Sequence, residues 1–584
     1  MKRLAVYLKG YETQSVLAPL FKLIEVVFDL IVPLVIARII NEGIANADTG
    51  FIFRQFSLLL GLAAIGLACS LCAQYFSAKA SVGFASRVRQ ALFDHIQTLS
   101  YSELDAVGTN TLITRLTSDI NQIQTGLNLT LRLLLRSPFI VFGAMAMAFT
   151  INVRCALIFL AAIPVLGAVV FGIMFVTIPL FKKVQASLDK VLGKTRDNLT
   201  GVRVIRAFRR EDDEVRAFDE ANRAYTGTSL KVGRISALMN PLTYALINIA
   251  TVLLIRQGAL EVHLGNIAQG DVVALYNYMA QIIVELIKLA NLIITIDKSL
   301  ACASRVSAIL DIEPGLSYPE TTAKISVEEK GLVEFDHVSF RYSGSPDDAI
   351  ADVSFRAEPG SVIGIIGGIG SGKSTVVNLI PRFYDASEGN VFVGGRNVRD
   401  YEKGGLSGII GVVPQKAVLF AGTVRDNMKI GNEDADDEEI WEALEIAQAK
   451  EIVENKENHL DFRIEQNGRN LSGGQRQRLT IARALVRHPE ILILDDSASA
   501  LDFATDARLR KALRTLHGKV TVFIVSQRTS SIRHADQILV MDDGKLADTG
   551  THEELMKSSE IYQEIYYSQF PEERPAKTLQ EAAA

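Results

Sequence analysis

The sequence predicts an all-α membrane domain of six transmembrane helices, followed by an α/β domain that binds a nucleotide through a P-loop. Apolar runs close to the roughly 20 residues needed to cross a bilayer crowd the first half of the 584 residues, and none recurs past residue 300. The second half instead alternates short apolar strands, glycine turns and helical patterns, which is typical of an α/β domain.

The six apolar runs define the first domain. They lie at about 17–40, 56–76, 133–153, 155–181, 237–258 and 272–297. A stack of buried helices in a soluble protein is the alternative, but six runs of near span length argue against it. We expect four segments, a six-helix transmembrane domain at 1–310, a polar linker at 311–330, a nucleotide-binding domain at 331–570 and a flexible tail at 571–584.

Composition excludes several other classes of protein. The net charge of −5 argues against a nucleic-acid-binding protein, which usually carries a basic face. The four cysteines, Cys69, Cys72, Cys155 and Cys302, include one C-x-x-C pair inside an apolar run but no further Cys or His cluster at metal spacing, so a zinc site is not expected. The basic start, MKRLAVYLKGYETQ, has no short apolar core with a cleavage site, so we expect no removed signal peptide.

Loop charge predicts the orientation of the membrane domain. The connection between the fourth and fifth runs is rich in lysine and arginine from Lys182 to Arg210, whereas residues 41–55 and 256–270 carry little positive charge. By the positive-inside bias, the N-terminus and the second half are cytoplasmic. The long basic connections look helical, and 206–225 is either a coupling element that docks on the nucleotide domain or a solvated helix face.

Acidic residues within the predicted spans are candidate cargo ligands. Glu25 and Asp29 lie four apart and so share a helix face, while Glu285 precedes Lys288 by three residues. Charges in a span are usually satisfied or functional. One alternative is that each glutamate pairs with a lysine of its own helix, Lys22 or Lys288. The other is that the three acids line a water-filled cavity and bind cationic cargo.

A glycine-rich loop marks the nucleotide site. The apolar strand 361–366 runs into a G-x-x-x-x-G-K-S pattern and then a helix, the context that a P-loop requires. Its backbone N–H groups would surround phosphate oxygens. Lys373 would reach the terminal phosphates and Ser374 would bind Mg²⁺. The candidate residues of the loop are Gly367, Gly368, Gly370, Ser371, Gly372, Lys373, Ser374 and Thr375.

A second apolar strand, 491–495, ends in Asp495. A carboxylate at this place can hold Mg²⁺ directly or through water. The alternative is an aspartate that caps the next helix, but its combination with a P-loop favours the metal role. ATP and Mg²⁺ are therefore the expected ligands.

A five-residue motif identifies a family. Leu471-Ser472-Gly473-Gly474-Gln475 resembles the signature motif of ATP-binding cassette (ABC) transporters, and it lies between the two strands as that family requires. The resemblance implies that Tyr342 stacks on adenine and that Gln415 senses Mg²⁺ and the membrane domain. It also implies that ATP is sandwiched between one chain's P-loop and the other chain's signature, so that Ser472 and Gly474 would contact the partner's ATP.

Six spans ahead of one such domain resemble the exporter branch of the family. The resemblance implies a half-transporter that must dimerise in a bacterial inner membrane. The opening stretch FKLIEVVFDLIVPLVIARIINEGI is most similar to heterodimeric multidrug exporters, which implies amphipathic, drug-like or lipid-like cargo.

Two residues depart from the family pattern. Asp496 stands where the family has a glutamate that polarises the attacking water, and Gln527 stands where it has a histidine. A carboxylate misplaced by about 1 Å can slow a reaction roughly a hundredfold, and an amide cannot carry imidazolium charge. We therefore expect a degenerate ATP site in one half of a heterodimer. The alternative is a homodimeric lipid or peptide flippase with slow hydrolysis.

Other classes fit less well. A regulator or DNA-maintenance protein that shares the cassette would not carry six apolar spans, and an importer would not fuse the spans to the cassette in this order.

Overall fold

The computed structural model describes residues 4–320, 329–497 and 500–574. The predicted linker residues 321–328 and the tail 575–584 lie outside these ranges. The chain divides into two compact units, Met1–Gln97 with Asn110–Asp311 (unit 1), and Thr98–Thr109 with Ile312–Ala584 (unit 2). The segment Thr98–Thr109 thus lies within the sequence range predicted for the membrane domain but packs with the second half of the chain.

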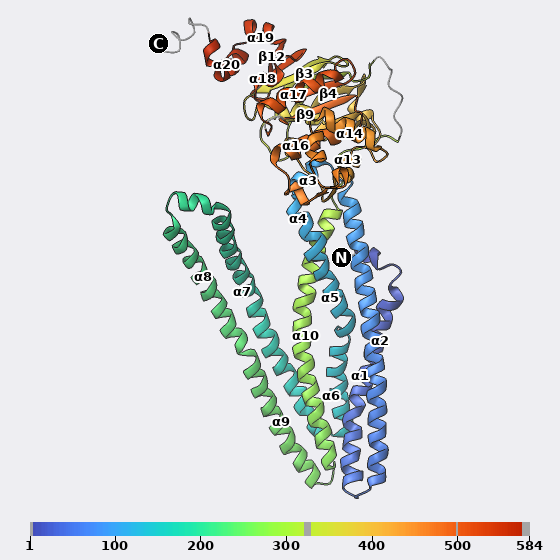
Figure 1. Ribbon diagram of the computed structural model, residues 1–584. Helices are drawn as coiled ribbons and strands as arrows, with labels where there is room; N and C mark the ends of the chain where they lie inside the picture. The colour runs from blue at the N-terminus through green and yellow to red at the C-terminus, as the bar shows by residue number, and fades with distance from the viewer. Residues whose placement is uncertain (1–3, 321–328, 498–499, 575–584) are drawn as a thin grey trace. The chain divides into compact units, whose positions relative to one another are not determined.

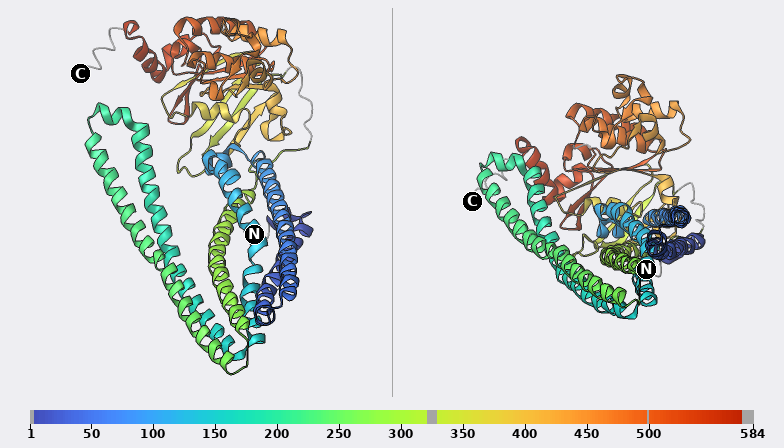
Figure 2. Two further views of the ribbon diagram at one scale, coloured as in Figure 1. Left: turned by 60° about the horizontal axis from the view of Figure 1, so that its bottom comes forward. Right: turned by 90° about the horizontal axis from the view of Figure 1, so that it is seen from below.

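Unit 1 is helical, and most of its helices are long (Figure 1). They are α1 (Glu12–Arg38), α2 (Thr49–Ile96), α4 (Thr109–Thr114), α5 (Ile120–Leu133), α6 (Arg136–Ile151), α7 (Val153–Ala207), α8 (Glu211–Ala237), α9 (Met239–His263) and α10 (Gln269–Leu310). Two short π-helical turns, Ile39–Ile44 and Arg115–Asp119, interrupt them. Helices α7, α8 and α9 form an arm that meets α10 at one end and parts from it toward the other (Figures 1 and 2).

Five helical stretches in the described part of the chain are long and apolar enough to cross a membrane. They are Thr49–Ile96, Thr109–Ile151, Val153–Ala207, Glu211–His263 and Gln269–Leu310. The first predicted span forms helix α1, but it is not among the five, since Lys22, Glu25 and Asp29 fall in the middle of its 27 residues. A membrane domain of several spanning helices is therefore supported, whereas the count of six is not confirmed.

The predicted long connections are helical. α2 has 48 residues and α7 has 55, more than twice the roughly 20 residues that a span needs. The basic segment after the fourth run continues α7 to Ala207, and α8 begins at Glu211 with four acidic residues in its first turn. Negative charge at a helix N-terminus is favourable because it opposes the partial positive charge of the helix dipole.

Unit 2 is an α/β domain with two main sheets. One is antiparallel, in the order β2-β1-β4-β5, with β1 (Val333–Phe340), β2 (Ile350–Ala357), β4 (Glu388–Val393) and β5 (Arg396–Asn397). The other has the order β12-β11-β3-β10-β9-β6. It contains β3 (Val362–Gly367), β6 (Ile410–Val413), β9 (Ile491–Asp495), β10 (Thr521–Val525), β11 (Gln537–Asp542) and β12 (Lys545–Gly550). Within it, only the pair β11–β12 of the described strands is antiparallel.

Helices pack on the six-stranded sheet or on one another. They include α11 (Lys373–Leu379), α13 (Val424–Lys429), α14 (Asp437–Ile446), α16 (Gly473–Leu485), α17 (Phe503–Leu513), α19 (His552–Ser558) and α20 (Glu560–Gln569). Strands β3 and β9 are almost wholly buried, as expected for parallel strands covered on both faces. This buried sheet fixes the positions of the loops that follow its strands.

Candidate functional site

The predicted nucleotide residues meet at one edge of the six-stranded sheet. Strands β3, β10, β9 and β6 are neighbours and parallel, so their carboxyl ends share an edge. Gly367 ends β3 and Asp495 ends β9, while Gln527 and Gln415 follow β10 and β6 by two residues. Ligands of open α/β sheets bind outside the carboxyl ends of the strands, and the sequence motifs converge there.

The P-loop takes a shape that its glycines allow. Gly370 and Gly372 have φ values of +84° and +91°, a region that L-residues with a side chain rarely adopt. A Cβ on Gly372 would also lie 2.6 Å from Ile350 Cγ2. Helix α11 then begins at Lys373, so its N-terminal N–H groups are available to an anion.

Lys373 donates hydrogen bonds to oxygen atoms of the P-loop itself. Its ammonium donates to the carbonyl oxygen of Gly367 at 3.0 Å, to that of Gly368, and to Ser371 Oγ at 3.3 Å. Burial lowers the pKa of Lys373, against the opposing effect of Asp496 and Asp495. Phosphate oxygens would supply the desolvated ammonium with the negative charge that the loop carbonyls lack.

Ser374 and Asp495 form a pair of oxygen ligands. Ser374 Oγ donates to Asp495 Oδ1 at 3.0 Å. Burial, with the nearby Asp496 carboxylate, raises the pKa of Asp495, so a cation bound there would relieve an unfavourable buried charge. A hydroxyl and a carboxylate are hard oxygen donors of the kind that Mg²⁺ prefers, and these residues therefore fit that ion.

The two departing residues lie at the same sheet edge. Asp496 follows β9 with a φ of +44°, in the left-handed region, and Gln415 Nε2 lies 3.4 Å from Asp496 Oδ2. Gln527 is exposed, and its backbone oxygen accepts a hydrogen bond from Gln569 Nε2 at 2.8 Å. Asp496 and Gln527 therefore lie where a hydrolytic pair would lie, and they differ from such a pair in their side-chain groups.

The predicted adenine aromatic lies in a cluster of rings. Tyr342 packs edge-on against Phe340 and Tyr384, with ring centroids 4.8 Å and 5.4 Å away. Its hydroxyl lies 3.2 Å from Thr375 Oγ1, so the ring is tied to the helix that follows the P-loop.

The signature motif forms the start of helix α16. Ser472 is the N-cap residue, and its Oγ accepts from Gln475 N at 3.3 Å while Ser472 N donates to Gln475 Oε1 at 3.0 Å. Leu471 is buried and anchors the motif, whereas Ser472 and Gly473 are exposed. Gly474 is partly exposed. Together these residues form a surface that offers a helix N-terminus and a hydroxyl to an outside ligand.

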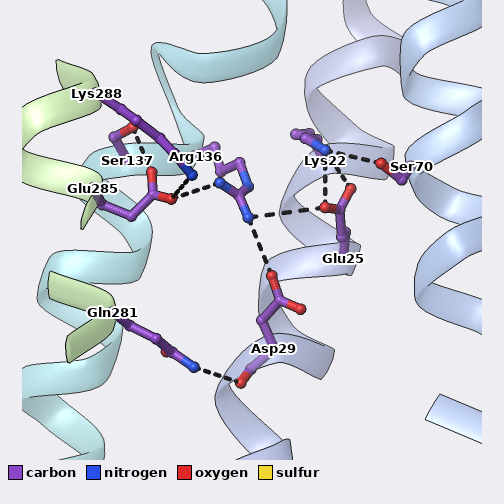
Figure 3. A network of polar contacts seen from close by, with 9 residues as sticks. All are labelled: Lys22, Glu25, Asp29, Ser70, Arg136, Ser137, Gln281, Glu285 and Lys288. Carbon is purple, nitrogen blue, oxygen red and sulfur yellow. Dashed lines mark hydrogen bonds and ion pairs between the residues drawn. The ribbon is translucent and has the colours of Figure 1, made fainter. Parts of the chain in front are cut away.

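The predicted membrane acids belong to one charge network (Figure 3). Arg136 on α6 lies at its centre, 2.6 Å from Glu285 Oε1, 3.2 Å from Asp29 Oδ2 and 3.9 Å from Glu25 Oε1. The network therefore joins α1, α6 and α10 across unit 1. Arg136 and Glu285 are largely buried, with side chains 13% and 4% exposed, whereas that of Asp29 is 42% exposed.

Both predicted pairs within a helix are present. Lys22 Nζ lies 2.6 Å from Glu25 Oε2, and Lys288 Nζ lies 2.9 Å from Glu285 Oε1. Three bases thus face three acids. The two glutamates pair both with Arg136 and with a lysine of their own helix, whereas the ion pair of Asp29 in the described part of the chain is with Arg136 of another helix.

We expect Arg136→Ala to destabilise the full-length chain. Removing one partner of a buried pair leaves an uncompensated charge and costs about 3 kcal/mol, which corresponds to a fall of about 5 °C in the unfolding midpoint. Thermal unfolding in detergent measures it. Arg223→Ala, which removes an arginine 80% exposed and paired to Asp219, is the matched control. Equal midpoints for the two variants would contradict a stabilising role of Arg136.

Comparison with known proteins assigns the chain to a family. The model of the ABC transporter transmembrane region matches residues 15–286, and the ABC transporter model matches residues 350–499. An uncharacterized ABC transporter ATP-binding protein of Mycobacterium tuberculosis is 36% identical over 566 residues, 96% of this chain and 97% of that protein. The chain belongs to the ABC transporter family.

Two further proteins match nearly the whole length of the transporter. An ATP-dependent lipid A-core flippase of Vibrio vulnificus is 30% identical over 577 residues, 98% of each chain. The structure of a bacterial Atm1-family ABC exporter with ATP bound matches with a TM-score of 0.78 and 22% identity, over 97% of this chain and 99% of that one. The transporter therefore has the exporter fold, with its transmembrane and ATPase domains fused in one chain.

Some residues of the transporter's sites were not predicted from the sequence. Arg136 is the first residue of α6, and no local pattern relates it to α1 or α10. Gln569 lies 42 residues after the backbone oxygen that it contacts. Tyr384 contacts the ring of Tyr342 from a segment between motifs. Each contact depends on tertiary packing, so sequence spacing carried no signal for it.

Proposed function

We propose that the chain is one half of a heterodimeric ABC exporter whose own ATP site binds ATP but hydrolyses it slowly. The observation that carries the proposal is the set of residues at the sheet edge. Lys373, Ser374 and Asp495 keep the groups that hold ATP and Mg²⁺, while Asp496 and Gln527 replace the two hydrolytic groups.

The chain's own residues would bind the nucleotide. Lys373 would exchange its loop carbonyls for phosphate oxygens, and Tyr342 would stack on adenine. Ser374, Asp495 and Gln415 would hold Mg²⁺, which when bound neutralises phosphate charge. The Asp496 carboxylate is one methylene shorter than that of glutamate and so would orient water poorly, and Gln527 can donate a hydrogen bond but brings no positive charge.

The signature would serve the partner's ATP. The exposed Ser472 and Gly473 on α16 supply a hydroxyl and a helix N-terminus, which together suit a γ-phosphate. In this arrangement the pair has one weak and one competent site, and hydrolysis occurs mainly at the partner's P-loop.

The cargo that fits best is amphipathic, drug-like or lipid-like. An apolar pocket of 380 Å³ lies between α7, α9 and α10, lined by residues such as Leu166, Leu246 and Ile283, and it suits the apolar part of such a molecule. Among the predicted cargo acids Glu25, Asp29 and Glu285, the most exposed is Asp29, so it is the best placed to meet a cationic head group.

We further infer that α1 completes six spans in a bacterial inner membrane, with the N-terminus and the ATPase domain cytoplasmic. The neutralisation of its charges by Lys22 and Arg136 supports this, because paired charges are tolerated in a bundle interior.

A homodimeric lipid flippase is the second candidate. The 30% identity to a lipid A-core flippase over nearly the whole chain favours it. In that case Asp496 would act as a slow catalytic base in both copies.

The composition of the complex separates the two candidates. The full-length chain with an affinity tag is co-expressed in its host with a second, differently tagged copy. The first tag is then used to purify the chain from the membranes. The heterodimer predicts recovery of an equimolar ABC half-transporter that has Glu after its strand-end Asp and His at the position of Gln527, with no capture of the second copy. Capture of that copy, with no such partner, would establish the homodimer instead.

A further inference from the structure

The last residue of helix α20, Gln569, binds the loop that carries Gln527. Helix α20 lies beside α18 (Thr529–Ile532), which begins two residues after Gln527 (Figure 1). The Gln569 side chain contacts this loop at two places. Its Nε2 donates to the carbonyl oxygen of Gln527 at 2.8 Å, and its Oε1 accepts from Thr529 N at 2.9 Å and from Thr529 Oγ1 at 3.0 Å.

The two contacts fix the conformation of the loop backbone. Thr529 is buried, and its N–H group lies at the start of α18, where a helix supplies no acceptor of its own. Gln569 Oε1 is the acceptor instead. Because the same amide also binds the Gln527 oxygen, Arg528 is held extended between the two contacts, with φ −97° and ψ +117°. Helix α20 therefore holds the backbone from which the Gln527 side chain extends.

Helix α20 is itself firmly anchored. Tyr562 and Tyr566 are buried, and the Tyr562 hydroxyl lies 2.9 Å from His552 Nδ1 of α19. The side chain of Gln527, by contrast, is exposed, so burial does not fix its direction. The backbone contact with Gln569 is thus the route by which the packed helix constrains an exposed residue.

We propose that Gln569 is a positioning residue that directs the Gln527 amide toward the γ-phosphate of ATP at this chain's P-loop. The inference rests on the proposed role of Gln527 as a hydrogen-bond donor at that site. Strands β10 and β3 are parallel neighbours, so the loop after β10 lies at the sheet edge where the P-loop follows β3. The preference of the site for ATP over ADP then depends on a residue that belongs to no nucleotide motif.

The experiment measures the affinity of the full-length chain in detergent for ATP·Mg²⁺ and for ADP·Mg²⁺. The ratio of the two affinities isolates the γ-phosphate, which ADP lacks. We expect Gln527→Ala to lower this ratio about tenfold, because a hydrogen bond to a charged group is lost. Gln569→Ala is expected to lower it about threefold, because the loop backbone is released. In a Gln527→Ala background, Gln569→Ala should change the ratio no further, since the side chain that it positions is gone.

Two further variants separate positioning from loss of stability. Gln569→Glu keeps the oxygens that accept from Thr529 but loses the N–H group that binds the Gln527 oxygen. It should therefore lower the ratio about threefold in a folded chain. Gln563→Ala is the matched control, since Gln563 belongs to the same helix and its Nε2 donates at 3.1 Å to Met556 O of α19. This variant should leave the ratio unchanged.

The outcomes distinguish the role of Gln527 from that of Gln569. An unchanged ratio in Gln527→Ala would remove the γ-phosphate role of Gln527 and the positioning role with it. A lower ratio in Gln527→Ala, beside unchanged ratios in Gln569→Ala and Gln569→Glu, would leave the role of Gln527 standing and overturn that of Gln569. An equal effect of Gln569→Ala with and without the Gln527 side chain would also overturn it. The composition of the complex is decided by the tagged copies and not by this ratio.

Discussion

Ser472→Arg in this chain is expected to abolish ATP turnover of the assembled pair, whereas Asp496→Asn changes it only slightly. Ser472 would donate to the partner's γ-phosphate, and loss of one such donor at a reacting group lowers the rate by about 10²–10³; the arginine also fills the space of the phosphate. In the proposed heterodimer Asp496 would lie at the slow site, so its charge would contribute little to total turnover. Steady-state ATPase assays of the purified pair measure both variants.

The control for Ser472→Arg is Thr551→Arg. Thr551 caps α19 with the same side-chain contact that Ser472 makes in α16, and loss of such a cap costs about 1 kcal/mol. Thr551→Arg therefore reproduces the structural damage without touching the signature, and turnover should survive it. Equal losses of turnover from Ser472→Arg and Asp496→Asn would refute the asymmetry.

Restoring the family residues is expected to create hydrolysis at this chain's own site. In a Ser472→Arg background, turnover at the partner's site is removed, so the remaining activity belongs to this P-loop. Asp496→Glu with Gln527→His should then raise that activity by about a hundredfold, because the longer carboxylate recovers about 1 Å of reach and histidine can carry a charge.

The distance from Gln415 Nε2 to Asp496 Oδ2, 3.4 Å, is longer than a good hydrogen bond of about 2.9 Å, and a glutamate could close it. The matched variant Asp496→Asn with Gln527→His in the same background keeps the histidine but removes the carboxylate, and should stay inactive. An unchanged rate in the Asp496→Glu, Gln527→His variant would show that other residues make the site slow.

The nucleotide site could be predicted because its parts are local motifs at strand ends. The P-loop is contiguous, and Asp495 and Gln415 each follow an apolar strand. Parallel strands bring their carboxyl ends to one edge, so motifs at strand ends share that edge, whereas the strand order and the contact of Ser374 with Asp495 come from the structure.

The membrane network could be predicted only in part. Lys22–Glu25 and Glu285–Lys288 follow from helical spacing, since residues three apart share a face. Arg136 is 107 residues from Asp29 and 149 from Glu285, and helix packing alone brings them together. The sequence left open whether the two glutamates pair with lysines of their own helices or all three acids bind cargo, and in the structure each acid has a base.

The contact between helix α3 (Tyr101–Val107) and Tyr384 was not predicted, for a similar reason. From its charge pattern, the sequence offers 206–225 as either a coupling element or a solvated helix face, and the coupling role remains a prediction. Tyr384 and Asp105 are 279 residues apart, and neither stands in a motif, so only the fold reveals their hydrogen bond.

The ATPase rate of the chain purified by itself, compared with that of the co-purified pair at the same concentration of this chain, tests the central claim most directly. The account predicts a rate for the isolated chain lower by about a hundredfold, although ATP·Mg²⁺ still binds to it. A symmetric pair of this chain that hydrolyses ATP as fast as the mixed complex would contradict it.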